Sequence, residues 1–196
     1  MAVEFELKFN ATPEAQAAIR ETLTAPAKVY KMQTTYYDTP AGSLSARNIT
    51  LRQRMENDIS VCTLKAPAKV GRAEYELECD TIENAIPELC KLANIPELPS
   101  LLTDGVVAVC GARFTRQAYP VVLEGAEVEL ALDQGILTGG GREIPLCEVE
   151  AELKSGTIAP LVAYAAQLAA KHGLQPEKKS KFARALALAK GADYGL

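Results

Sequence analysis

Charged side chains recur at alternating positions in five separate segments of this 196-residue sequence. They are Glu4, Glu6 and Lys8; Arg52 and Arg54; Arg72, Glu74, Glu76 and Glu78; Glu127, Glu129 and Asp133; and Glu148, Glu150 and Glu152. Carboxylate oxygens are the hard ligands that Mg²⁺ and Mn²⁺ prefer, whereas arginine and lysine bind phosphate oxygens. Together they suit a metal–polyphosphate complex, in which metal ions polarise a phosphoryl group and activate water without a nucleophilic side chain.

The spacing of these charges indicates β-strands. In residues 3–9, apolar and charged residues alternate strictly, which is the period of a half-buried strand. Residues two apart on a strand stand roughly 6.5–7 Å apart on the same side, so facing strands can direct their charges at one ligand. A single strand of this kind commonly faces water. Five of them, with clustered acids and arginines, indicate a polar interior whose apolar outer faces are covered by helices.

The whole pattern predicts an α+β fold with mainly antiparallel strands. Strands are expected near residues 3–9, 28–38, 48–56, 59–66, 72–79, 106–118, 126–133, 136–139 and 143–154, and helices near 12–23, 82–93, 157–172 and 179–190. Asp133-Gln134-Gly135 is typical of a hairpin turn, and residues 95–105 of a loop. A count of about eight strands allows closure, so we expect a closed eight-stranded antiparallel β-barrel with a polar interior, flanked by helices.

Composition places the chain among ordinary globular domains. Hydrophobic residues make up 48%, charged residues 23%, and the net charge is −4. One domain over residues 1–196 is expected, with no general attraction to nucleic acid or to anionic membranes. Five scattered cysteines and a single histidine, His172, argue against a disulfide framework, a zinc site and a catalytic triad. The sequence shows no apolar run of about 18 residues and no signal-peptide core, so a cytoplasmic protein is expected.

The charged segments also carry a family resemblance. Glu4-Phe5-Glu6-Leu7-Lys8 resembles the E-x-E-x-K strand that defines the CYTH, or triphosphate tunnel metalloenzyme, superfamily. A single motif of this kind arises by chance on charged strands, but the further similar motifs follow in order along nearly the whole chain. They are Tyr36-Tyr37-Asp38-Thr39-Pro40, Leu51-Arg52-Gln53-Arg54, Thr63-Leu64-Lys65, Arg72-Ala73-Glu74-Tyr75-Glu76, Arg116, Glu129-Leu130-Ala131-Leu132-Asp133, the Glu148, Glu150 and Glu152 strand, and Ser180-Lys181 with Arg184.

The resemblance implies a tunnel for a triphosphate and a role for each of these residues. The implied cofactor is a divalent metal, Mg²⁺ or Mn²⁺, with ligands among Glu4, Glu6, Glu129, Asp133, Glu148, Glu150 and Glu152. The implied substrate-binding residues are Lys8, Arg52, Arg54, Lys65, Arg72, Arg116, Lys181 and Arg184. The implied catalytic residues are Lys8, Arg52, Glu74 and Glu76, of which the two acids would help a second metal or position water.

Several functions fit these residues, and hydrolysis of inorganic tripolyphosphate to pyrophosphate and phosphate is favoured. The sequence has no tryptophan and only 6% aromatic residues to stack an organic base, and residues 129–135 resemble the bacterial inorganic triphosphatases. Thiamine triphosphatase and class IV adenylate cyclase are alternatives on the same fold. A module that binds polyphosphate without cleaving it is more remote, because a pure anion binder gains nothing from so many carboxylates. The expected partner is a small-molecule triphosphate, and the oligomeric state stays open, with a homodimer as one option.

Overall fold

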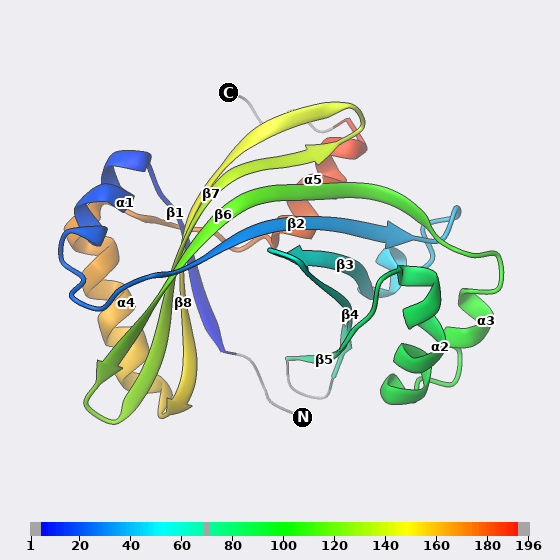
Figure 1. Ribbon diagram of the computed structural model, residues 1–196, viewed down its shortest axis with the longest axis horizontal. Coiled ribbons are helices and arrows are strands. Elements are labelled where there is room, and N and C mark those ends of the chain that lie inside the picture. The colour runs from blue at the N-terminus through cyan, green and yellow to red at the C-terminus, as the bar shows by residue number, and fades with distance from the viewer. Residues whose placement is uncertain (1–4, 69–70, 192–196) are drawn as a thin grey trace.

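A single antiparallel sheet dominates the computed structural model of the protein, which describes residues 5–68 and 71–191. Strands β2, β6, β7 and β8 are the longest, and they arch together across the molecule (Figure 1). The strands of the described residues are β1 (Glu6–Asn10), β2 (Lys28–Asp38), β3 (Thr50–Glu56), β4 (Ile59–Pro67), β5 (Arg72–Glu78), β6 (Val107–Leu123), β7 (Ala126–Gly139), β8 (Arg142–Gly156) and β9 (Gln175–Pro176).

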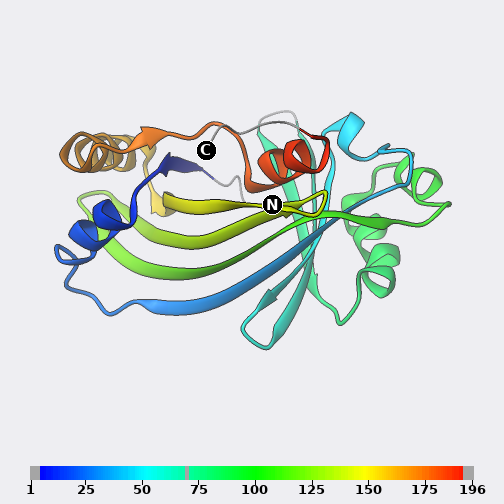
Figure 2. The same cartoon turned by 90° about the horizontal axis from the view of Figure 1, so that it is seen from above.

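The helices lie at both ends of this sheet and on its concave side. They are α1 (Pro13–Arg20), α2 (Ile82–Ala93), α3 (Leu98–Leu101), α4 (Ile158–His172) and α5 (Lys181–Ala189), with a 3₁₀ turn η1 (Ser45–Arg47). Helices α1 and α4 lie together at one end, and α2 and α3 at the other (Figure 1), while α5 lies in the concavity (Figure 2). Side-chain oxygens of Thr12, Thr81 and Ser180 accept backbone N–H bonds and start α1, α2 and α5. In the part of the chain described, no helix is long and apolar enough to cross a membrane.

The sheet is open, so the prediction of a closed eight-stranded barrel is wrong. Its strand order is β5-β4-β3-β2-β6-β7-β8-β1-β9, and within the described ranges the two edges, β5 and β9, do not pair with each other. Closure would need the β5 edge to pair with β1. The second edge of β1 is instead taken in part by β9, through Phe9 opposite Pro176 and Asn10 opposite Gln175. Pro176 has no N–H with which to continue a ladder, which helps to end the sheet there.

Three apolar clusters hold the elements together. One joins α1 and α4 to the outer faces of β7 and β8, with Ile19, Leu130 and Val149 at its centre. A second joins α2 and α3 to the outer faces of β3 and β4. A third lies on the inner face, where α5 packs on β2, β6 and β7. The expected covering of the outer face by helices is therefore present for two helix pairs, whereas α5 occupies the inner face.

The expected hairpin turn at Asp133-Gln134-Gly135 is not formed. These residues lie within the continuous strand β7, which pairs with β6 on one side and β8 on the other through this segment. A Cβ atom on Gly135 would lie 2.1 Å from the carbonyl oxygen of Arg113 and 2.5 Å from the Cα of Phe114. Glycine is needed here for a close approach of two strands, not for a turn.

Candidate active site

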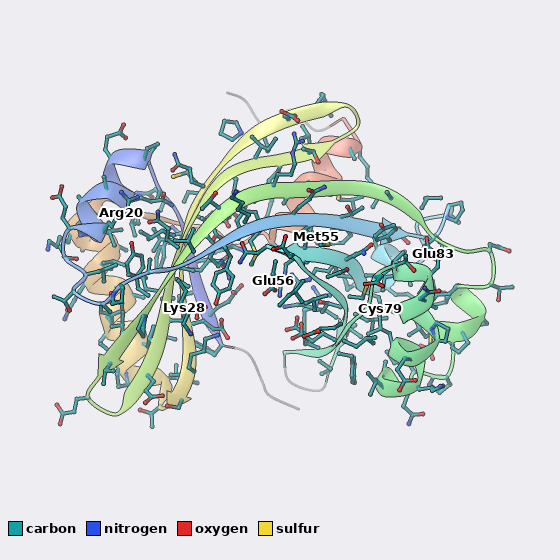
Figure 3. The ribbon with its side chains drawn as sticks, in the orientation of Figure 1. Arg20, Lys28, Met55, Glu56, Cys79 and Glu83 are labelled. Carbon is teal, nitrogen blue, oxygen red and sulfur yellow. The ribbon has the colours of Figure 1, made fainter. Side chains whose placement is uncertain are left out.

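The strand register brings the charged residues of distant segments to one face of the sheet. Lys65 on β4 lies opposite Glu74 on β5. Further along the strand order, Arg116, Asp133 and Glu148 lie in one row across β6, β7 and β8. Paired residues point to the same side of a sheet, and so do alternate residues of each strand. The inner, concave face is therefore the charged one. Polar side-chain tips gather beneath the arch of the long strands, around the labelled Glu56 (Figure 3).

A cavity of about 140 Å³ opens on this face. Its lining includes seven of the predicted phosphate-binding residues and three of the predicted metal ligands: Lys8, Arg52, Arg54, Lys65, Arg72, Arg116, Lys181, Glu6, Glu150 and Glu152. A second cavity of about 590 Å³ shares Arg52, Arg54, Arg116 and Glu152 with the first, and its lining adds Glu74, Glu76 and Glu129. The two form one charged space, which is cation-rich on one side and richer in carboxylates on the other.

Three of the predicted site residues that the structure describes do not line this space. Asp133 and Glu148 are completely buried, and Arg184 lies buried beside Glu148, so these three lie beneath the cavity. A fourth predicted residue, Glu4, lies outside the described residues.

Arg52 and Arg54 have donors that the protein leaves without acceptors. The Nε atoms of both side chains are buried and make no hydrogen bond. Arg52 contacts Glu74 through Nη2 at 3.3 Å, and Arg54 pairs with Glu56. Burial, together with the neighbouring charge of Arg52, lowers the pKa of Arg54. A buried donor without a partner costs free energy, and an anion in the cavity would supply the missing acceptor.

The β4–β5 side of the cavity is cross-linked by its own ion pairs. The Nζ of Lys65 lies 3.0 Å from Glu74 Oε2, so this carboxylate bridges Lys65 and Arg52. Thr63 donates to Glu76 over 3.5 Å. The Nη2 of Arg72 donates to three oxygens of the protein itself: the carbonyls of Asn48 and Lys65 and the hydroxyl of Thr50. Arg72 therefore holds the strand end in place as well as lining the cavity.

A denser network of charges lies on the β7–β8 side. Lys181 Nζ contacts three carboxylates, at 2.9 Å from Asp133, 2.6 Å from Glu148 and 2.6 Å from Glu150. Arg116 binds Asp133 with two parallel hydrogen bonds of 2.8 and 2.7 Å, and it also contacts Glu150. Arg184 pairs with Glu148. Helix α5 supplies both Lys181 and Arg184, so its packing on the inner face sets this network.

The network fixes the charge state of its members. Burial alone would raise the pKa of Glu150, but the charges of Lys181 and Arg116 outweigh it and lower that pKa. Burial would lower the pKa of Lys181, but Glu150, Asp133 and Glu148 together raise it well above its ordinary value. Arg116 also keeps a raised pKa, because bonds to Asp133 outweigh its desolvation. These groups are therefore ionised throughout the neutral range.

A separate row of carboxylates lines the two cavities. Glu6 on β1 lies opposite Glu152 on β8, which lies opposite Glu129 on β7. Like charges directly opposite each other destabilise a sheet unless a cation lies near them. Lys154 provides part of that charge, at 2.7 Å from Glu152 and 3.8 Å from Glu129. Hard oxygen donors of this kind are the donor set that suits Mg²⁺ or Mn²⁺.

Some residues of the site were not singled out from the sequence. Lys154 continues the alternation of Glu150 and Glu152 by one step, so the period-two pattern contained a signal for it. Glu177, in the segment after β9, contacts Arg184 at 3.7 Å and accepts a hydrogen bond from Asn10. Nothing in the local sequence marked Glu177 as more than part of a solvated charge run.

The fold and the site define a class: an α+β protein whose curved antiparallel sheet carries, on its inner face, a cavity lined by arginines, lysines and carboxylates. The sequence model of the CYTH domain matches residues 2–186, and the chain belongs to the CYTH domain family.

Named relatives agree with this assignment. The inorganic triphosphatase of Haemophilus influenzae is 30% identical over 171 residues, which are 82% of this chain and 48% of that protein. This chain thus spans about half the length of its curated relative. A proposed adenylyl cyclase from Hippeastrum, described as having a dominant triphosphatase activity, shares the fold with a TM-score of 0.67, 22% identity and 95% coverage of each chain. A proposed adenylate cyclase from Bacillus halodurans matches with a TM-score of 0.63 and 16% identity, over 93% of this chain and 96% of that one.

Proposed function

We propose that residues 1–196 form one CYTH domain that hydrolyses a triphosphate, and that its substrate is inorganic tripolyphosphate, cleaved to pyrophosphate and phosphate. The observation that carries the proposal is the cavity, in which buried arginine donors without acceptors stand beside a row of carboxylates. The activity of the Haemophilus influenzae relative supports the reaction class. In this reaction water adds to a terminal phosphorus, one P–O–P bond breaks, pyrophosphate leaves, and a proton is released.

The roles of the residues follow from where they lie. Lys8, Arg52, Arg54 and Arg116 would bind and orient the phosphates, because their charges line the cavity. The metal, Mg²⁺ or Mn²⁺, would be held from the carboxylate row, by Glu6 and Glu152 with Glu129 nearby and Glu4 as a predicted fourth ligand. A metal bound there supplies Lewis acidity towards the phosphoryl group and water. Glu74 would position Arg52 and Lys65, which it bridges.

The aromatic residues of the cavity favour an inorganic substrate. Tyr36 and Phe182 pack on each other with ring centroids 5.0 Å apart. The ring of Phe114 is covered by the charges of Lys181, at 5.2 Å, and Arg116, at 5.9 Å. These three rings of the first cavity are therefore engaged with the protein itself, which leaves less of their faces for stacking a nucleobase or thiazolium ring.

The test is turnover of tripolyphosphate, thiamine triphosphate and ATP, each with Mg²⁺ and with Mn²⁺, measured as phosphate, pyrophosphate and cyclic AMP released. We expect kcat/KM to be highest for tripolyphosphate and activity to be lost on adding a chelator. If ATP gave cyclic AMP faster than tripolyphosphate gave phosphate, the cyclase alternative would replace this proposal. Tight binding of tripolyphosphate without release of phosphate under either metal would leave only the binding-module alternative.

A further inference from the structure

Three buried carboxylates of the inner face have oxygens within 4.8 Å of one another, and such a group could surround a metal ion: Asp133, Glu148 and Glu150. The sequence motifs assign all three to the metal. Their contacts in the folded protein point elsewhere, because each of their six oxygens already contacts a cationic side chain. Asp133 binds Arg116 and Lys181, while Glu148 binds Lys181 with one oxygen and Arg184 with the other. Glu150 likewise divides its two oxygens between Lys181 and Arg116.

The charges of this network balance one another, although Glu148 Oε2, which lies 2.6 Å from Lys181 Nζ, and Arg184 Nε are buried without a hydrogen bond. The carboxylates are balanced one for one by three cations: Arg116, Lys181 and Arg184. Asp133 and Glu148 are fully shielded from solvent, and the side chain of Lys181 is only 11% exposed. A divalent ion at this point would have to expel the Lys181 ammonium and leave it buried without a counter-charge, which is strongly unfavourable.

Lys181 cannot easily move aside, because it belongs to the first turn of α5. Ser180 caps this helix at Ala183, and Phe182 and Ala185 pack into the apolar cluster of the inner face. Gly139 of β7 lies so close to α5 that a Cβ there would be 2.4 Å from the carbonyl oxygen of Ala185. The helix is therefore held against the sheet, and it holds the ammonium over the three carboxylates.

We propose that Asp133 and Glu148 are positioning residues that hold Lys181 and Arg116 at the phosphate-binding surface, and that these two acids are not ligands of the metal. This inference rests on the proposed triphosphatase function. Lys181 and Arg116 both line the cavity, whereas Asp133 and Glu148 do not, so the two acids reach substrate only through these cations. Without the acids, two cations that both contact Glu150 would repel each other and lose their orientation.

The closing experiment separates metal binding from substrate binding in the full chain. Mn²⁺ affinity is measured by electron paramagnetic resonance, tripolyphosphate affinity by calorimetry with Mn²⁺ present, and KM and kcat by phosphate release, for Glu148→Gln and for its matched control Glu152→Gln. We expect Glu148→Gln to weaken tripolyphosphate binding and raise KM by at least about tenfold, with Mn²⁺ affinity changed by less than about twofold. Glu152→Gln should show the opposite pattern, with Mn²⁺ affinity reduced by at least about tenfold.

A coupling measurement tests whether Glu148 acts through Lys181. In a Lys181→Met background, Glu148→Gln should cause little further loss of tripolyphosphate affinity, because the group that it holds is already gone. Additive losses, or a loss of Mn²⁺ affinity in Glu148→Gln as large as in Glu152→Gln, would overturn the inference. Asp133→Asn serves as the second variant, with circular dichroism melts to identify any variant that does not fold. A wild-type chain that binds neither Mn²⁺ nor tripolyphosphate would refute the proposed function itself. The results for the variants test only the inference about Asp133 and Glu148, so the two failures can be told apart.

Discussion

At the residue scale, the guanidinium groups of Arg52 and Arg54 lack hydrogen-bond acceptors in the cavity. Each has a buried Nε donor without an acceptor, on an inner face where most other charged groups are paired. Arg54→Lys keeps the charge but removes the planar fork that can bind two oxygens of one phosphate. We expect KM for tripolyphosphate to rise roughly tenfold or more, since hydrogen bonds to charged groups contribute about 1.5–3 kcal/mol. Steady-state kinetics at saturating Mg²⁺ measure this.

The matched control for that change is Arg113→Lys. Arg113 lies out of phase with Arg116 on β6, and its exposed side chain pairs with Glu143 on the outer face at 2.8 Å. Exposed ion pairs contribute little, so the kinetic constants should stay within about twofold of wild type. An equal rise of KM in both variants would mean that overall charge, and not the geometry of the cavity, governs binding.

Glu150 and Lys181 make the stability of the metal-free protein depend on pH in a definite direction. The pKa of Glu150 is lower in the folded protein than its ordinary 4.5, so its ion pairs contribute stability above about pH 4.5 and lose it as the pH falls through the lower, folded value. The pKa of Lys181 is raised from 10.5, so its contribution is present below that pH and is lost only as the pH rises through the raised value.

Urea unfolding of the wild type and Glu150→Gln across pH checks this linkage. The free energy of unfolding should differ most between about pH 5 and pH 10, and the difference should shrink as the pH falls below 4.5. A difference that stayed constant down to the acid limb would show that the pKa of Glu150 does not change on folding, and one that grew there would show that folding raises it.

At the scale of elements, α5 supplies the cations that pair with the carboxylates of β7 and β8. Its backbone passes so close to Gly139 that a methyl group there would meet the Ala185 carbonyl oxygen at 2.4 Å and the Ala189 nitrogen at 2.8 Å. Gly139→Ala must therefore shift α5, and overpacking of this kind costs about 1–3 kcal/mol. Because α5 carries Lys181, tripolyphosphate affinity should fall together with the thermal midpoint, as measured by calorimetry and circular dichroism.

Thr138→Ala is the control for the helix position. Thr138 is the neighbour of Gly139 on β7, and its side chain points to the opposite side of the sheet, so the change adds no atom next to α5. The substrate affinity of this variant should match that of the wild type. If Gly139→Ala melted lower and yet bound tripolyphosphate as tightly as the wild type, α5 would have no part in positioning Lys181.

The elements themselves differ in how far the sequence could predict them. Period-two alternation placed Glu148, Glu150 and Glu152 on one face of one strand correctly, because that pattern is local. It could not separate their roles, which depend on a cation delivered by α5 from another part of the chain. The glycine at residue 135 was interpreted as a turn residue because glycine suits both a turn and a close approach of strands, and only the neighbouring Phe114 decides between them.

At the scale of the whole molecule, the closed barrel was the prediction that failed. Counting strands does not reveal which edges meet, because edge pairing depends on the curvature of the sheet and on what else covers each edge. Here β9, a strand of two residues, takes the end of β1. The charged residues that were expected inside a barrel line a cavity on the inner face of an open, curved sheet instead.

The two sides of the cavity come from strands that are far apart in the sheet. Arg52 and Arg54 lie on β3, whereas Lys8 lies on β1 and Glu150 and Glu152 lie on β8. A ligand that bridges them should therefore stabilise the whole fold. Tripolyphosphate at about one hundred times its Kd adds about 2.7 kcal/mol to the free energy of unfolding, which raises Tm by roughly 5–10 °C in a protein of this size.

Differential scanning calorimetry with Mg²⁺ measures this shift, and sulfate at the same ionic strength is the control. Because the ligand binds through charge, the shift should decrease as salt rises from about 0.1 M to 1 M. A shift as large with sulfate as with tripolyphosphate would show that the cavity recognises anions in general, without a site for a chain of three phosphates.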